Sequence, residues 1–413
     1  GKIFLKYQIC HLLTSGNTTL AECSWALLNN NASISSMHTV VTHMNTVIML
    51  DHTNTGPSAI KLLNGRCRNQ PAERISKVDC YAHSIMFNPG NNQVRPLYVY
   101  TDTWCSSGQF FNNGRMVQTG GDFEGNRKIR TLQPCGAGGN CDWVELEENL
   151  VTGCWYSSNQ LLPSGIQQII VGGRNTPSYE FYPKRRAGEG FYNLGMLGGD
   201  NNLYPFVYLL PNGDLFVVKG YPQILGNPRN YLFAGSAVML PLTWQIGFEF
   251  AQIMVCGGAA AGASNTGNAN APMSFSCGTI VASSKNPGWG KANNPALNPV
   301  NYNPVTKQFQ IYAKTNILRM YHSTANLLAD ERVLLVRSKT HQFYTFNGVR
   351  LAIQGYLNRI KYKQVFVVNF AMGQRVGVVE VNMNSAPYVT HSFAQGQRQM
   401  KLKTMLPTKA GNG

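Results

Sequence analysis

The 413-residue chain has few charged residues: they make up 13% of it, against about 25% in typical soluble domains. Coiled coils and long charged helices are excluded, because both carry dense charge along their surfaces. Acidic residues are the scarcer kind, at 19 against 35 Lys and Arg, and the net charge is +16. The tightest basic group, Lys184–Arg186, is short. We therefore expect no nucleic-acid binding, and an acidic polysaccharide is the more natural partner for this surplus.

Long hydrophobic runs are missing as well. No stretch reaches the roughly 18 apolar residues of a membrane span, so we expect no membrane contact. The first residues, GKIFLKYQICHLL, are too polar for a good secretion signal, which leaves open a signal that has been removed. Ten cysteines and two glycosylation sequons, at Asn17 and Asn31, favour an oxidising, secreted setting.

Glycine and aromatic residues are plentiful, with 41 Gly, 19 Tyr and 19 Phe, which indicates many turns and short β-strands. One pattern recurs: an apolar start, a strand, a turn, a second strand and a Gly-Gly pair. Its clearest copies, 105–121 and 156–173, are spaced close to the ~50 residues of a kelch blade. A longer copy covers 234–258. Looser copies begin at Met37, Tyr204 and Tyr321. The six copies predict an all-β chain built around a β-propeller of four-stranded blades.

In a propeller, the innermost strand of each blade begins beside the central axis, so residues at one repeat position converge. Cys105 and Tyr156 hold near-equivalent positions in neighbouring copies, and Tyr321 and His322 open another inner strand. One thiol, two phenols and one imidazole would meet at the axis. Imidazole with oxygen donors suits Cu(II), whereas no CxxC pair or HExxH motif indicates zinc. The alternative is a set of ordinary buried, hydrogen-bonded side chains.

Four segments resemble the copper radical oxidases, and in particular the plant aldehyde oxidase (glyoxal oxidase-like) group related to galactose oxidase. They are TDTWCSSGQ (101–109), GCWYSSNQLLPSG (153–165), RMYHSTANLL (319–328) and SAPYVTHSFAQGQR (385–398), and they follow the family's order. The resemblance extends from about residue 30 to 403. It implies a kelch-type propeller over 31–340, seven-bladed in the family, after an N-terminal extension over 1–30. An immunoglobulin-like β-sandwich, apparently truncated, is implied over 341–413.

The same resemblance implies a copper site. Cys105 and Tyr156 would form a thioether-linked radical cofactor, and Tyr156, Tyr321, His322 and His391 would bind one copper ion, with Tyr321 as proton acceptor. The chain would oxidise aldehydes to carboxylic acids and reduce O2 to hydrogen peroxide outside the cell, in the wall or apoplast. Copper stores one electron and the tyrosine the other. Two alternatives stay open: a galactose- or alcohol-preferring oxidase, and a non-catalytic propeller that binds carbohydrate or protein.

Several further expectations accompany this interpretation. Plausible disulfides are Cys67–Cys80, Cys135–Cys141, Cys256–Cys277 and Cys10–Cys23, which leaves Cys154 unpaired beside the site. The family's aromatic shield of the linked tyrosine falls in a stretch that holds Tyr179, Phe181 and Tyr182. His38, His83, Trp104 and Trp155 are interpreted as packing residues. We expect no hairpin between Cys277 and Tyr321, so that the ring would close with fewer blades or be incomplete there.

Overall fold

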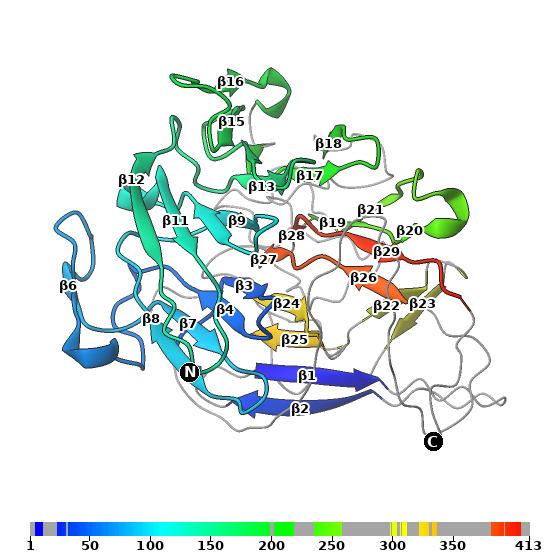
Figure 1. The fold of residues 1–413 in the computed structure, drawn as a ribbon. Helices are drawn as coiled ribbons and strands as arrows, with labels where there is room; N and C mark the ends of the chain where they lie inside the picture. The colour runs from blue at the N-terminus through cyan, green and yellow to red at the C-terminus, as the bar shows by residue number, and fades with distance from the viewer. Residues whose placement is uncertain are drawn as a thin grey trace, which may run out of the picture.

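The structure is a computed structural model, and it describes residues 5–10, 23–29, 32–198, 202–218, 235–257, 298, 300–303, 306, 308–311, 322–329, 333–336, 381–391 and 393–405. These residues form short sheets set around a common axis, as the predicted all-β propeller requires (Figure 1). The helices among them are single 3-10 turns: η1 (Leu63–Gly65), η2 (Phe123–Gly125), η3 (Gly195–Leu197) and η6 (Trp244–Ile246). None of the described helices has the length and hydrophobicity needed to span a bilayer.

Three complete blades follow one another in the first half of the chain, each with four antiparallel strands. Their strands are β3 (His38–Val41), β4 (Val47–Leu50), β7 (Ser84–Phe87) and β8 (Val94–Leu97); β9 (Ser107–Phe110), β10 (Met116–Thr119), β11 (Lys128–Leu132) and β12 (Val144–Asn149); and β13 (Ser158–Leu161), β14 (Gln168–Val171), β15 (Ser178–Tyr182) and β16 (Tyr192–Asn193). The inner strands β3, β9 and β13 begin where the repeats at 37, 105 and 156 predict. A small hairpin, β5 (Arg68–Asn69) with β6 (Val78–Asp79), lies between β4 and β7.

Later in the chain, strand pairs are described. They are β17 (Phe206–Leu209) with β18 (Leu215–Val218), β19 (Gly235–Met239) with β21 (Ile253–Gly257), and β22 (Val300–Asn303) with β23 (Gln308–Ile311). The predicted starts at 204 and 234 are confirmed. The expectation of no hairpin between Cys277 and Tyr321 is wrong, because β22 and β23 pair antiparallel there. Tyr302 packs on Phe309 across this pair. The Asn and Pro residues beside these strands are typical of loops, which is why the sequence did not predict the strands.

A fourth complete blade joins the two ends of the ring. Its inner strands are β24 (Thr324–Leu327) and β25 (Val333–Val336), and its outer strands are β1 (Leu5–Cys10) and β2 (Cys23–Asn29). Strand β1 pairs antiparallel with β25, from Lys6 opposite Leu335 to Gln8 opposite Val333. The segment 1–30, expected as an extension, thus supplies half of a blade. Closing the ring in this way leaves no free edge on β25.

The C-terminal part sends a hairpin to the middle of the ring (Figure 1). This hairpin consists of β27 (Tyr388–Thr390) and β28 (Phe393–Gln395), and β27 pairs antiparallel with the inner strand β3. Beside it, β26 (Asn382–Asn384) and β20 (Leu242–Thr243) flank β29 (Gln399–Lys401) in a three-stranded sheet. The rest of the sandwich expected over 341–413 lies outside the described residues.

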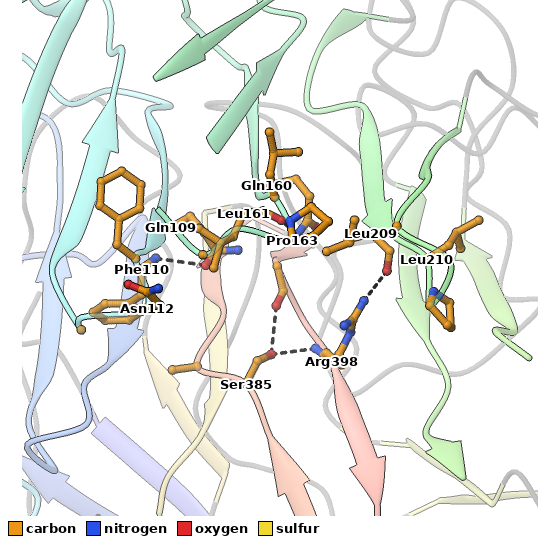
Figure 2. Close-up of a pocket in the computed structure, with 18 of the residues that line it drawn as sticks. Gln109, Phe110, Asn112, Gln160, Leu161, Pro163, Leu209, Leu210, Ser385 and Arg398 are labelled. Carbon is orange, nitrogen blue, oxygen red and sulfur yellow. Dashed lines mark hydrogen bonds between the residues drawn. The ribbon is translucent and has the colours of Figure 1, made fainter. Parts of the chain in front are cut away.

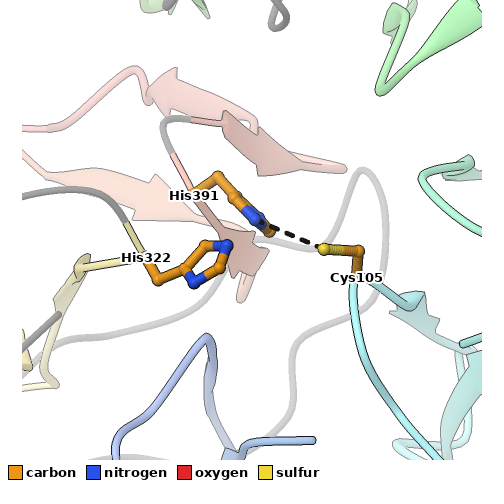
Figure 3. Close-up of side chains that lie close together, drawn as sticks. All are labelled: Cys105, His322 and His391. Carbon is orange, nitrogen blue, oxygen red and sulfur yellow. Dashed lines mark hydrogen bonds between the residues drawn. The ribbon is translucent and has the colours of Figure 1, made fainter. Parts of the chain in front are cut away.

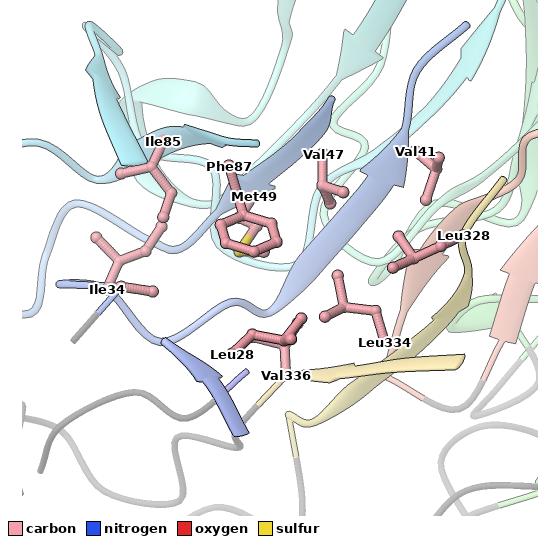
Figure 4. Close-up of a cluster of buried hydrophobic side chains, with 11 residues drawn as sticks. Leu28, Ile34, Val41, Val47, Met49, Ile85, Phe87, Leu328, Leu334 and Val336 are labelled. Carbon is pink, nitrogen blue, oxygen red and sulfur yellow. The ribbon is translucent and has the colours of Figure 1, made fainter. Parts of the chain in front are cut away.

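Hydrophobic clusters between blades hold the ring together. One cluster joins the first blade to the last, with Met49 and Phe87 from β4 and β7 against Leu334 and Val336 from β25 (Figure 4). All four side chains are completely buried. Since burying one such side chain stabilises a fold by about 1.5–3 kcal/mol, these contacts position the inner strands firmly around the axis.

Two of the predicted disulfides are present, Cys67–Cys80 and Cys135–Cys141. Cys10 and Cys23 lie directly opposite each other in the β1–β2 register, although their side chains are not described. Cys277 and the sequon residues Asn17 and Asn31 lie outside the described part of the chain. Cys154 is a buried thiol, as the cysteine count predicted.

Candidate metal centre

Four blades place a thiol, phenol or imidazole side chain at the same position, two residues before the inner strand begins. These residues are Cys105, Tyr156, Tyr204 and His322, and all four have left-handed backbones, with φ of 50°, 64°, 43° and 66°. The backbone N–H of Tyr156 donates to the carbonyl of Cys105 at 2.9 Å, and that of Tyr204 donates to the carbonyl of Tyr156 at 2.7 Å. Hydrogen bonds between blades therefore fix the backbone positions of Cys105, Tyr156 and Tyr204 relative to one another.

A fifth residue, His391, reaches this place from the C-terminal hairpin. It occupies the turn between β27 and β28, again with a positive φ of 53°. The thiol of Cys105 and the ring nitrogens of His322 and His391 all lie within 4.8 Å of one another, and all three residues are buried (Figure 3). Cys105 Sγ is 3.6 Å from His391 Nε2, and the two imidazole rings meet edge to face with centroids 4.6 Å apart.

Tyr156 borders this cluster. A hydrogen bond with Tyr156 lowers the pKa of the Cys105 thiol, although burial raises that pKa by more. The Tyr156 ring centroid is 6.0 Å from that of His391, 5.3 Å from that of Tyr204 and 4.9 Å from that of Trp155. The structure thus brings together four of the five residues that the sequence singled out. The fifth, Tyr321, lies outside the described residues.

Burial favours the neutral form of two histidines near the hairpin, His391 and His38. Burial lowers the pKa of His391 well below its usual value, and the nearby His322 and His38 lower it further. Burial also lowers the pKa of His38 to about 3. A neutral imidazole keeps a lone pair, which is the form that binds metal ions.

Residues that the sequence treated as packing, or left without a role, surround the cluster. Tyr204 contacts the rings of both Tyr156 and His391, and its offset from the inner strand was the signal that could have revealed it. Trp155 lies against the Tyr156 ring, whereas Tyr179 and Phe181 pack on each other and on Tyr192. The ring contacts of Tyr156 named above therefore come from outside the stretch in which a shield was sought.

A cavity of about 680 Å³ lies at the opposite ends of the inner strands (Figure 2). It is lined by the turns that follow β9, β13 and β17, and by Ser385 and Arg398 from the C-terminal segment. Arg398 donates one hydrogen bond to the carbonyl of Leu209 and another to the Ser385 hydroxyl. None of the clustered residues lines this cavity.

Comparison with known proteins agrees with this arrangement. The profile of the family described as glyoxal oxidase N-terminus matches residues 37–290 and 282–359, and that of the galactose oxidase-like early set domain matches residues 350–412. The chain belongs to the glyoxal oxidase family. The C-terminal match identifies the domain that provides the central hairpin.

Several relatives of this glyoxal oxidase family member are oxidases by name. Aldehyde oxidase GLOX of Vitis pseudoreticulata is 40% identical over 93% of this chain and 88% of the relative, and aldehyde oxidase GLOX1 of Arabidopsis thaliana is 30% identical over 92% and 76%. A fungal alcohol oxidase of the AA5 family, solved in complex with copper, superposes with a TM-score of 0.57 over 90% of this chain and 88% of that structure, at 15% identity. The last similarity shows a common fold.

Proposed function

We propose that this chain is a copper radical oxidase that oxidises aldehydes to carboxylic acids and reduces O2 to hydrogen peroxide. One observation carries the proposal: a buried thiol and two imidazoles from three distant segments meet within 4.8 Å, beside a tyrosine ring, in a member of an oxidase family. A purely structural cluster has no need of this combination, because apolar side chains would fill the same space without loss of hydrogen bonds.

The donor set fits copper. His322 and His391 would provide imidazole nitrogens, and Tyr156 and Tyr321 would provide phenol oxygens, a combination that Cu(II) prefers. Bound copper would supply one-electron redox chemistry, which covers half of a two-electron oxidation. Tyr321 would accept the proton of the substrate hydroxyl group, and His391, neutral as its low pKa requires, is ready to bind without first losing a proton.

Cys105 and Tyr156 would provide the second electron as a linked cofactor. A bond from the cysteine sulfur to a ring carbon of the tyrosine replaces one S–H and one C–H bond. The two electrons and two protons released pass to O2, which becomes hydrogen peroxide. A sulfur substituent lowers the oxidation potential of the Tyr156 ring. The rings of Trp155, Tyr204 and His391 surround the Tyr156 ring and would keep large reactants away from it.

The reaction is proposed to take place outside the cell, with Asn17 and Asn31 glycosylated. Support comes from the two disulfides, since such bonds persist in oxidising compartments. Expression in a secreting host followed by glycosidase treatment should lower the mass of the wild-type protein. The mass of a variant that carries both Asn17→Gln and Asn31→Gln should stay unchanged.

The function is tested by loading the purified protein with Cu(II) in air and measuring peroxide release with panels of aldehydes, alcohols and galactose. We expect fastest turnover with aldehydes and none after removal of copper. A preference for galactose or alcohols would assign the same site to the alternative substrates. If the protein binds no copper and releases no peroxide with any of them, it is a non-catalytic propeller.

A further inference from the structure

A line of buried hydrogen bonds connects His391 to the protein backbone through two residues outside the cluster. His38 Nε2 lies 3.1 Å from the carbonyl oxygen of Thr103, and His38 Nδ1 lies 2.8 Å from Thr390 Oγ1. Thr390 Oγ1 lies 2.7 Å from Nδ1 of its neighbour His391. His38 and Thr390 are completely buried, and they lie opposite each other where β27 pairs with β3.

Only one arrangement of protons satisfies this line. The carbonyl oxygen of Thr103 can only accept, so His38 carries its proton on Nε2. The partners of the buried His38 ring are the Thr103 carbonyl and the hydroxyls of Thr390 and Ser106, none of which is charged, so the imidazole is neutral. A neutral imidazole carries one proton, and because that proton is on Nε2, Nδ1 accepts a hydrogen bond. The hydroxyl of Thr390 then donates its single proton to His38, and its oxygen is left to accept. His391 must therefore hold its proton on Nδ1.

The consequence appears on the other side of the His391 ring. With the proton on Nδ1, the lone pair is on Nε2, the atom 3.6 Å from Cys105 Sγ and within the cluster that includes His322. Before any cross-link forms, the Cys105 thiol can donate to this lone pair. In the other tautomer, Nε2–H would point into the cluster and block a metal ion.

We infer that His38 and Thr390 are positioning residues that fix the tautomer and orientation of His391, so that its Nε2 lone pair faces the metal centre. The inference deepens the proposed function and depends on it for the identity of the ion. A merely structural role is a poor explanation, because the backbone ladder between β27 and β3 already joins these strands. Thr390→Val would preserve that ladder and the β-branched shape of the side chain while removing the hydroxyl.

The experiment compares Thr390→Val, which removes the hydroxyl, with Thr390→Ser, which keeps it. The tautomer is measured first, in the metal-free full chain, by long-range proton–nitrogen NMR of protein with labelled histidines, with His391→Gln to assign the resonance. We expect Nδ1–H in the wild type and in Thr390→Ser, and the Nε2–H form or a mixture in Thr390→Val. An Nε2–H tautomer in the wild type, or no change in Thr390→Val, would overturn the inference.

Copper affinity is measured second, by anaerobic competition titration with Cu(II). Loss of a residue that orients a metal-binding histidine typically weakens binding by about 10–100-fold, which we expect for Thr390→Val and for His38→Ala. Thr390→Ser should stay within about threefold of the wild type. Unchanged affinity in Thr390→Val would contradict the inference.

Two controls separate the possible failures. Thr42→Val also removes a buried hydroxyl, one that bonds Thr46 Oγ1 at 2.8 Å, and it should change neither the tautomer nor copper binding. If Thr42→Val lowers copper affinity as much as Thr390→Val, the effect is one of stability and the inference is overturned. If the wild type binds no copper, the proposed function fails. The tautomer measurement in the metal-free protein still tests whether His38 and Thr390 hold the His391 proton on Nδ1.

Discussion

The two ends of the inner strands use the same unusual backbone conformation in different ways. Where β9, β13 and β17 end, the turns place glycine at positive φ: Gly114 at 80°, Gly165 at 72° and Gly213 at 92°. Where the inner strands begin, the left-handed residues are Cys105, Tyr156, Tyr204 and His322, although each such residue with a side chain costs about 1 kcal/mol. Glycine would remove that strain at the start of the strands as well.

At the start of the strands, the need for a particular side chain outweighs the backbone's preference for glycine. Strain at non-glycine residues indicates function when it recurs at one place and the side chains converge. Here the recurrence covers four blades: Cys105 and His322 belong to the cluster, and Tyr156 and Tyr204 lie beside it. The turns at the far end show the default solution, in which only chain reversal is required.

The largest effect that this comparison predicts is on chemistry. His322→Asn keeps a residue that tolerates a positive φ but removes the imidazole, so copper affinity and peroxide release should both fall by more than about 100-fold. Titration with Cu(II) and a peroxide assay measure the two losses, and the melting temperature should change little. Full activity in this variant would remove His322 from the site.

A pH-dependent effect is expected beside Cys105. Burial, assisted by Glu124 and Glu73, raises the pKa of Asp102 to about 7, above its value in the unfolded chain. The unfolded chain therefore releases this proton at lower pH than the folded protein, and the stability of the fold falls as pH rises from about 4 to 7. Relative to Asp102→Asn, the wild type should lose about 2 kcal/mol between pH 5 and 7 in denaturant titrations. The exposed Asp214, in a turn at the far end, provides the control, because the free energy of unfolding of Asp214→Asn should depend on pH as that of the wild type does. If the free energies of unfolding of the wild type and Asp102→Asn differ by the same amount at pH 5 and pH 7, the Asp102 carboxyl is ionised over this range and the prediction is wrong.

Backbone strain at the start of the strands can be measured directly. Cys105→Gly and Cys105→Ala both lose the thiol, but only glycine relieves the positive φ. The free energy of unfolding of Cys105→Gly should therefore exceed that of Cys105→Ala by about 1 kcal/mol. This is the reverse of the usual order, in which alanine is more stable than glycine within a helix or strand. Chemical denaturation of the two variants decides this, and a more stable alanine variant would mean that the conformation carries no strain.

At the far end we expect an effect on stability alone. A Cβ added at Gly213 would meet only Pro163 Cγ, at 3.8 Å, so Gly213→Ala tests the φ of 92° without a clash. We expect a loss of about 1 kcal/mol in the free energy of unfolding and no change in peroxide release. Reduced turnover at unchanged copper content would mean that the two ends are not functionally separate.

The sequence predicted the parts of this molecule that repeat. Inner strands follow Met37, Cys105, Tyr156, Tyr204 and Tyr321 because the turn and glycine pattern is local. The pairing of β1 with β25 was missed, since it joins segments more than 300 residues apart and leaves no periodic signal. The hairpin of β22 and β23 was missed because its turn lacks the glycine found in the turns after β9, β13 and β17.

The site was predictable in part for the same reason. Cys105, Tyr156 and His322 share a repeat position, whereas His391 could be identified only through the resemblance to a family. Tyr204 shares that repeat position too, but tyrosine is common and no metal-binding motif marks it. The contact of His38 with Thr390 depends on the β3–β27 register across 352 positions, which no local pattern encodes.

The proposed function requires that a thiol and a phenol from neighbouring blades become one cofactor at the axis, and peptide mass spectrometry detects the bond between them. After incubation with Cu(II) in air, reduction and alkylation, we expect a single linked species that contains Cys105 and Tyr156 and is lighter by two hydrogen atoms than the separate peptides. Tyr156→Phe should not form it. Complete alkylation of Cys105 in the copper-treated wild type would contradict the account.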